Sequence, residues 1–255
     1  MNCVDVERSN GVLVAALNRG TINALNTALI AELERILKEV REDPEIDGLV
    51  LTSANDKFFS IGFALPELYP LRRDEFADFF RGFNHLCLTL YTIPKPTVTA
   101  LTGHATAGGC ILALCTDYRL AAAGNSRMGI NESQLGVPVT YLAYRVLADL
   151  VGTRHARDAM YSGILYSPDD ALAIGMIDKV VAAHRIRAAS VAKAKDLAST
   201  SRQAFAADKG FRVRAIYEAV IAGLEEEESA FIDQWYAPEA RELLGRALDK
   251  FQPRP

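Results

Sequence analysis

Residues 97–116 carry the stretch TVTALTGHATAGGCILALCT, in which three local patterns follow one another. The run 97–101 is rich in β-branched and apolar residues, which is typical of a strand. Residues 103–109 are almost all small and predict a turn, and the apolar run 110–116 predicts the start of a helix. A strand that leads through a short turn into a helix is a building unit of layered α/β folds.

The same alternation extends outward from this stretch. Asn10-Gly11 lies between two short apolar runs and predicts a β-hairpin, and apolar residues recur at helical spacing over 29–40. From residue 186 onward only helical patterns appear. We therefore expect an α/β core in residues 1–185 and a helical C-terminal region in residues 186–255. The further runs that predict strands are 48–52, 118–122 and 127–130.

The composition excludes several classes of protein. Half of the 255 residues are hydrophobic, which supports a sizeable core and excludes global disorder. A formal charge of −4 without a basic cluster argues against general nucleic-acid binding. The four cysteines lack zinc-ligand spacing, so we expect reduced thiols, no metal site and a cytoplasmic location.

The sequence also argues against secretion and membrane insertion. Asp5, Glu7 and Arg8 precede any apolar run, unlike the layout of a secretory signal. Residues 96–116 carry no formal charge, but they include three glycines and five threonines. Two buried elements joined by a turn fit this composition better than a membrane span does.

Two turns of small residues are candidates for an anion-stabilising site. In 59–65 (FSIGFAL), Gly62 permits a positive φ, which turns the chain sharply and aims the next amide outward. In 103–109, the turn precedes a helix whose first amides have no intrahelical partner. Two such amides aimed at one point would bind an oxygen that becomes negative during a reaction. The alternative is that both turns are purely structural.

Glu132 is the candidate for proton transfer. It lies in the segment MGINESQLGVP at 128–138, where an acid among apolar neighbours would have a raised pKa and move a proton near neutral pH. The alternative is an exposed glutamate in a loop.

Six segments form a pattern through their order and spacing. They are NALN at 23–26, FFSIGF at 58–63, TGHATAGGC at 102–110, CTDYR at 115–119, NESQLG at 131–136 and SPDDALAIGMIDKV at 167–180. This pattern resembles the enoyl-CoA hydratase/isomerase family, or crotonase superfamily, over about residues 10–185. The resemblance implies a spiral of repeated ββα units with a helical C-terminal region that packs on the core or on a neighbouring subunit.

The resemblance also implies a ligand and an assembly. Members of the family bind acyl-CoA thioesters and are usually trimers or dimers of trimers, so we expect a homotrimer or a dimer of trimers. Coenzyme A is then part of the substrate, and no separate cofactor is expected. By position, the backbone amides of Phe63 and Gly108 would hold the thioester carbonyl. The residues implied to line the coenzyme A and pantetheine are Ala24, Ile61, Gly62, Ala64 and Leu65.

The resemblance further discriminates between reactions. Hydratases of this family use two glutamates, one directly after the Gly-Gly-Cys segment and one at the position of Glu132. The first of these positions is Ile111 here, which cannot polarise a water. Shifting a double bond needs only one base, so we expect a Δ3,Δ2-enoyl-CoA isomerase of fatty acid β-oxidation. Asn131 would either orient Glu132 or serve as a simple turn residue.

Two departures from the family pattern concern the acyl pocket. Many relatives have Asp where this chain has Ala64, and the oxyanion residue Phe63 is bulky enough to shape or narrow the pocket. Tyr141 either reaches the pocket or packs in the core, and packing is favoured.

Three alternative functions remain open. One is another crotonase reaction, such as that of a specialised hydratase, a dehydratase or a thioester hydrolase. A second is a non-catalytic acyl-CoA-binding protein, against which a carboxylate at position 132 argues. A third is RNA binding, against which the acidic charge balance argues.

Overall fold

The computed structural model describes residues 2–249 and builds the core around two sheets. The larger sheet has the strand order β1-β2-β3-β5-β7-β9, and its neighbours are parallel except for the antiparallel β1–β2 pair. Its strands are β1 (Val4–Ser9), β2 (Val12–Leu17), β3 (Gly48–Ser53), β5 (Thr97–Leu101), β7 (Tyr118–Ala122) and β9 (Lys179–Val181).

The predicted hairpin joins β1 to β2. Asn10 and Gly11 have φ values of 52° and 80°, as a two-residue turn with left-handed backbone requires. Every residue of β2 and β3 is buried, because helices and the second sheet cover both faces of the larger sheet. This explains why VLVAAL at 12–17 and LVL at 49–51 are continuous apolar runs rather than alternating ones.

The smaller sheet produces the spiral. It consists of the parallel strands β4 (Phe58–Ser60), β6 (His104–Thr106) and β8 (Met128–Gly129). Along the chain, each of these strands directly follows a strand of the larger sheet: β4 follows β3, β6 follows β5, and β8 follows β7. The chain therefore winds through repeated strand–strand–helix turns, which confirms the α/β spiral that the sequence predicts.

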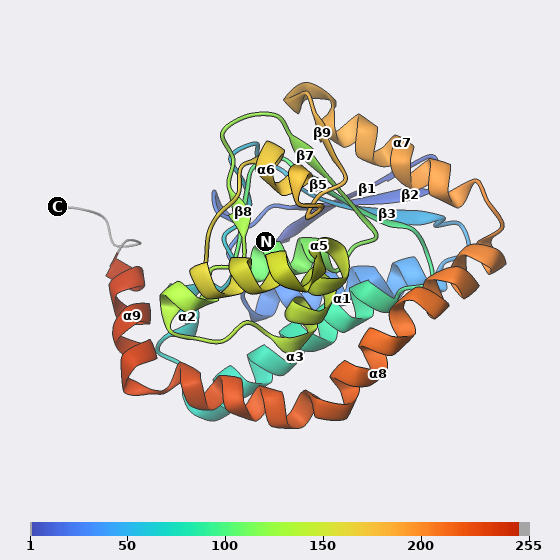
Figure 1. Ribbon diagram of the computed structural model, residues 1–255. Helices are drawn as coiled ribbons and strands as arrows, with labels where there is room; N and C mark the ends of the chain where they lie inside the picture. Colours follow the sequence, from blue (N-terminus) through green and yellow to red (C-terminus); the bar gives the residue numbers. More distant parts are fainter. Residues whose placement is uncertain (1, 250–255) are drawn as a thin grey trace.

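Helices cover the sheets and complete the core (Figure 1). In α1, the side chain of Asn26 accepts a hydrogen bond from the amide of Leu29 at 3.0 Å and so caps the first turn. One face of α1 is buried, and it carries the apolar residues that recur at helical spacing. The first helices are α1 (Thr27–Glu42), α2 (Leu65–Leu68), α3 (Arg73–Thr92), α4 (Gly108–Leu114), η1 (Glu132–Leu135), α5 (Tyr141–Ser162) and α6 (Pro168–Ala173).

The C-terminal region packs on its own chain. Ile186 and Ala194 of α7 are buried against the larger sheet, and α8 runs along α3 (Figure 1). The remaining elements are η2 (Ala183–Arg185), α7 (Ile186–Ala198), α8 (Arg202–Trp235) and α9 (Pro238–Asp249). The division at residue 185 and the role of 186–255 in oligomerisation stay predictions, and residues 250–255 lie outside the described part.

A buried ion pair anchors α8 to the core. The ammonium of Lys209 lies 2.8 Å from the Asp117 carboxylate, which Arg212 also contacts at 2.7 Å. Asp117 in turn accepts a hydrogen bond from the amide of Thr97 at 2.9 Å. This network fixes the start of α8 against the beginning of β5, and it thereby positions the rest of α8.

One boundary differs from the sequence prediction in a useful way. The turn predicted over 103–109 contains the short strand β6, and the following helix begins at Gly108 rather than at Cys110. Gly108 is therefore the first helical residue, and its amide has no intrahelical acceptor.

Within residues 2–249, no helix combines the length and the apolar character that crossing a membrane requires.

Candidate functional site

The two small-residue turns meet. Gly62 has a φ of 90°, and a Cβ atom built on it would lie 2.9 Å from the amide nitrogen of Gly108 and 3.1 Å from the Cβ of Ala107. Only glycine fits this position, for both conformational and steric reasons. The turn after β4 thus lies directly against the N-terminus of α4.

The amides of Phe63 and Gly108 are available to a ligand. The amide of Leu25 donates to the carbonyl of Gly62 at 2.7 Å, and the amide of Ala64 donates to the carbonyl of Leu25 at 2.8 Å. The Phe63 amide takes no part in this parallel bridge between Leu25 and Phe63 and points away from Leu25. Within residues 2–249, neither the Phe63 amide nor the Gly108 amide finds an acceptor.

The residue before Gly108 has an unusual backbone. Ala107 has φ 48° and ψ −130°, outside the regions that an alanine prefers. Such a conformation costs on the order of 1–3 kcal/mol and is concentrated at functional sites. The amide of Ala107 donates to the carbonyl of Gly129 at 3.0 Å, which holds the strained turn in place.

The ring of Phe63 is fixed by its surroundings. It meets the rings of Phe79 and Phe83 edge-on, each with centroids 4.9 Å apart. A Cβ atom on Gly108 would lie 3.1 Å from the Phe63 ring, so a larger residue at 108 would require this ring to shift. As expected, the bulky side chain of Phe63 forms part of the pocket wall.

Glu132 is buried at the start of η1. The residue is only 6% exposed, and its Oε2 atom has no hydrogen-bond partner within the described chain. Burial raises the pKa of this carboxyl to about 7. Its charge, after burial itself, helps to raise the pKa of the Cys110 thiol to about 12, so that thiol stays protonated. The alternative prediction, that Glu132 is an exposed glutamate in a loop, is therefore wrong.

One cavity of about 230 Å³ brings the candidate residues together, and we call it the Glu132 cavity. Among the described residues that line it, Glu132 is the single ionisable one, and most of the others are apolar. The lining residues that the sequence had singled out are Ile61, Phe63, Leu65, Gly108, Ile111 and Glu132.

Four other candidates do not line this cavity. Gly62 and Ala64 shape the turn that presents Phe63, and both are buried. The carbonyl of Ala24 accepts a hydrogen bond from Arg19 at 2.8 Å. Asn131 precedes η1, and its buried amide oxygen has no partner within residues 2–249. Within the described residues, no hydrogen bond joins its side chain to the Glu132 carboxyl.

Several lining residues were not anticipated. Some belong to segments next to the predicted turns, and others come from α3, α8 and α9, far away along the chain. Sequence spacing carries no signal for the distant ones, because their place depends on how α8 crosses the core. They are Phe83, Thr106, Ala107, Leu135, Val137, Thr140, Phe231, Trp235 and Ala247.

The arrangement supports one type of chemistry. Two free amides would stabilise a negative oxygen, and a single carboxyl with a pKa near 7 would remove or return a proton beside it. The apolar wall excludes water and strengthens both electrostatic effects.

Comparison with known proteins agrees with this geometry. The family model for enoyl-CoA hydratase/isomerase matches residues 7–252. The chain is 35% identical over 179 residues to enoyl-CoA delta isomerase 1, mitochondrial, from Mus musculus, an alignment that covers 70% of this chain and 62% of that protein. It is 31% identical over 182 residues to the short-chain-enoyl-CoA hydratase of Clostridium acetobutylicum, covering 71% and 69% respectively.

A solved structure shows the same fold over nearly the whole chain. The crystal structure of human mitochondrial delta3-delta2-enoyl-CoA isomerase superposes with a TM-score of 0.94 at 26% identity, covering 97% of each chain. The matched part spans less than two thirds of the length of the rodent isomerases, at 62% for both mouse and rat.

Proposed function

The chain belongs to the enoyl-CoA hydratase/isomerase family, and from this premise we propose that it is an acyl-CoA enzyme that moves the double bond of a 3-enoyl-CoA to the 2-position. The observation that carries the proposal is the lone carboxyl of Glu132 in a cavity that Phe63 and Gly108 also line, both with unpaired backbone amides within residues 2–249. Ile111 lies in the same wall, where hydratases of the family have a second glutamate.

The reaction needs one base and one oxyanion site. The thioester oxygen accepts hydrogen bonds from the amides of Phe63 and Gly108, which acidifies the protons on C2. The Glu132 carboxylate takes one C2 proton, and the electron pair delocalises into a dienolate whose oxygen carries the charge. The same carboxyl then returns the proton to C4, and the double bond lies between C2 and C3. Each amide would contribute about 3–4 kcal/mol to lowering the barrier.

The environment of Glu132 suits a base that is regenerated in each turnover. Its pKa of about 7 lies close to physiological pH, so the ionised and neutral forms are both accessible. The apolar lining keeps the carboxyl from being solvated and leaves it reactive toward the substrate.

A second candidate is hydration of a 2-enoyl-CoA, which the similarity to the clostridial hydratase favours. Incubation of the protein with 3-enoyl-CoA and with 2-enoyl-CoA in deuterated water separates the possibilities. Isomerisation yields a shifted double bond without added water, hydration yields a 3-hydroxyacyl-CoA, and thioester hydrolysis yields free CoA. Conversion of 2-enoyl-CoA to the hydroxy product at a rate above that of isomerisation would reject the proposal.

Assembly and location belong to the proposal as well. A homotrimer or a dimer of trimers follows from family resemblance and stays a prediction, as does a cytoplasmic location. The mouse relative is named as mitochondrial, so the compartment of this chain needs its own measurement.

A further inference from the structure

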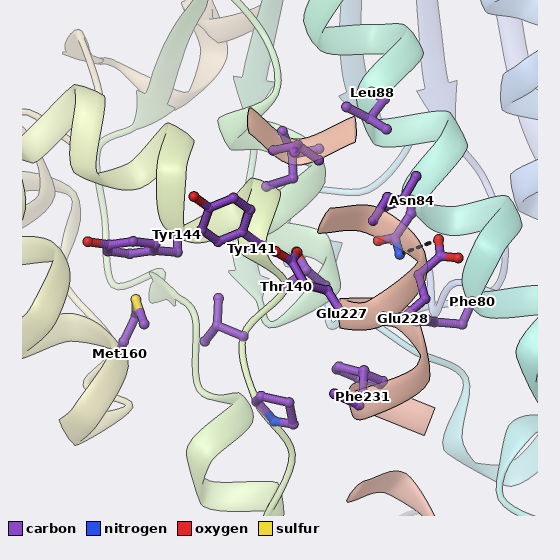
Figure 2. Close-up of a pocket in the computed structure, with 16 residues that line it drawn as sticks. Phe80, Asn84, Leu88, Thr140, Tyr141, Tyr144, Met160, Glu227, Glu228 and Phe231 are labelled. Carbon is purple, nitrogen blue, oxygen red and sulfur yellow. Dashed lines mark hydrogen bonds between the residues drawn. The ribbon is translucent and has the colours of Figure 1, made fainter. Parts of the chain in front are cut away.

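A second cavity adjoins the Glu132 cavity. It has a volume of about 310 Å³ and lies between α3, α8 and the segment that leads into α5, and we call it the distal cavity. Thr140 and Phe231 line both cavities, and we call these two residues the partition. Figure 2 shows them among the residues that line the distal cavity. Its wall is mainly apolar and includes Phe80, Leu88, Leu142, Val220, Leu224 and Met160.

Phe231 closes the partition in this structure. The residue is 4% exposed and its ring stacks on Phe80 with centroids 4.0 Å apart, whereas Thr140 is only partly buried. A chain passes from one cavity to the other only when the Phe231 ring turns away from Phe80. An acyl chain whose thioester is held at Gly108 would occupy the Glu132 cavity, and a chain too long for this cavity would continue past Phe231, which also lines it.

The distal cavity also contains a buried polar pair. The side-chain nitrogen of Asn84 on α3 donates to the carboxylate of Glu228 on α8 at 3.0 Å, and the two residues are 6% and 8% exposed. Figure 2 draws the amide oxygen of Asn84 on the side away from Glu228. The guanidinium of Arg81 approaches Glu228 at 3.7 Å but is largely exposed, so it neutralises the carboxylate only weakly.

The polar groups in the distal cavity are mainly hydrogen-bond acceptors. The carboxylates of Glu227 and Glu228 and the amide oxygen of Asn84 accept. The donors among the lining side chains are the Asn84 amide nitrogen, which already donates to Glu228, and the hydroxyls of Thr140 and the two tyrosines. A plain alkyl end would cover these acceptors without pairing them, which costs free energy. A terminal carboxylate would in addition meet two acidic side chains.

From this juxtaposition we propose that the distal cavity receives the far end of a long acyl chain and favours an end that carries a hydroxyl group. The inference rests on the proposed acyl-CoA function and narrows its substrate class to long-chain thioesters with a hydrogen-bond donor near the ω-end. Asn84 and Glu228 are then specificity-determining residues, and Phe231 lies where the chain passes from one cavity to the other.

Binding of saturated acyl-CoA thioesters tests this independently of the reaction. Calorimetric Kd values are measured for hexanoyl-CoA, dodecanoyl-CoA, 12-hydroxydodecanoyl-CoA and 11-carboxyundecanoyl-CoA. We expect the hydroxylated C12 thioester to bind about tenfold tighter than the unsubstituted one, as one additional hydrogen bond provides. The carboxylated thioester should bind weakest of the three C12 ligands.

Variants separate the two polar residues. Asn84→Leu should remove the preference for the hydroxylated chain over the plain chain. Glu228→Gln should reduce the penalty for the carboxylated chain, while the exposed Glu226→Gln on the same helix serves as the matched control. Leu224→Trp, which fills the cavity, should lower the ratio of C12 to C6 affinity.

The outcomes are distinct. Equal affinity for all C12 thioesters, or tighter binding of the plain alkyl chain, overturns the inference. If hexanoyl-CoA still binds in that case, the proposed function stands. Absence of hexanoyl-CoA binding overturns the proposed function and the inference with it.

Discussion

The amide nitrogen of Gly108 lies 2.9 Å from the point that a Cβ atom of Gly62 would occupy, so the turn at Gly62 and the N-terminus of α4 are in direct contact. The contact joins residues that are 46 positions apart and sets the spacing of the neighbouring Phe63 and Gly108 amides. An atom added at position 62 would push the two segments apart, and the proposed oxyanion site requires that they stay close.

Gly62→Ala should therefore impair the reaction more than it impairs folding. The methyl group would push the Gly108 amide away, and the loss of one oxyanion donor typically lowers kcat by about 100-fold or more. Steady-state kinetics on 3-hexenoyl-CoA and the Tm measure the two effects separately.

Gly20→Ala is the matched control for this change. Gly20 also has a positive φ of 59°, but a Cβ atom there would have no neighbour within 4 Å. We expect it to lower the Tm and to leave kcat within about twofold, because it lacks the steric contact. Equal losses of kcat in both variants would contradict the role of the Gly62–Gly108 contact.

The rate should depend on the ionisation of Glu132. Because burial raises the pKa of this carboxyl to about 7, the base form increases with pH across neutrality. A plot of log kcat/KM against pH should rise with a slope near one below pH 7 and level off above it. A rate that is already constant from pH 5 upward would show that the base has an ordinary carboxyl pKa.

The same shift predicts a pH-dependent effect on stability. The folded chain retains the Glu132 proton up to about pH 7, whereas an unperturbed carboxyl releases it near 4.5. The free energy of unfolding therefore falls as pH rises through this interval. The stability of Glu132→Gln relative to the wild type should increase by up to about 3 kcal/mol between pH 5 and pH 8.

Urea unfolding at the two pH values measures this difference, and the exposed Glu225→Gln serves as the control. If the stability difference between Glu132→Gln and the wild type does not change with pH, the pKa of the Glu132 carboxyl is not raised by folding.

Lys209→Met should loosen α8. The change removes one partner of the buried Lys209–Asp117 pair, which typically costs about 3 kcal/mol or more in the free energy of unfolding. Arg212→Met removes a half-exposed partner of the same carboxylate and should cost about 1 kcal/mol or less. Chemical denaturation compares the two, and an equal effect would argue against an anchoring role for Lys209.

Much of the fold and the centre of the site are predictable from local sequence. The hairpin at Asn10-Gly11, the strand at 97–101 and the turn around Gly62 depend on short-range geometry, and the structure contains all three. These features need no knowledge of distant contacts. For Glu132 the local sequence left burial and an exposed loop both open, and the structure shows that it is buried.

The outer wall of the site was not predictable in this way. Phe231 and Trp235 reach the Glu132 cavity only because α8 crosses the molecule beside α3. Their spacing on a long helix is equally compatible with ordinary core packing. The distal cavity has the same origin, since Asn84 and Glu228 meet through tertiary packing across 144 residues.

The most direct test of the account is the isomerisation rate of Glu132→Gln with 3-hexenoyl-CoA. The substitution keeps the size of the side chain and removes its ability to accept the C2 proton, and we expect kcat to fall by about 100-fold or more. Circular dichroism confirms that the variant is folded. A folded variant that keeps more than about a tenth of the wild-type rate would contradict the assignment of Glu132 as the base.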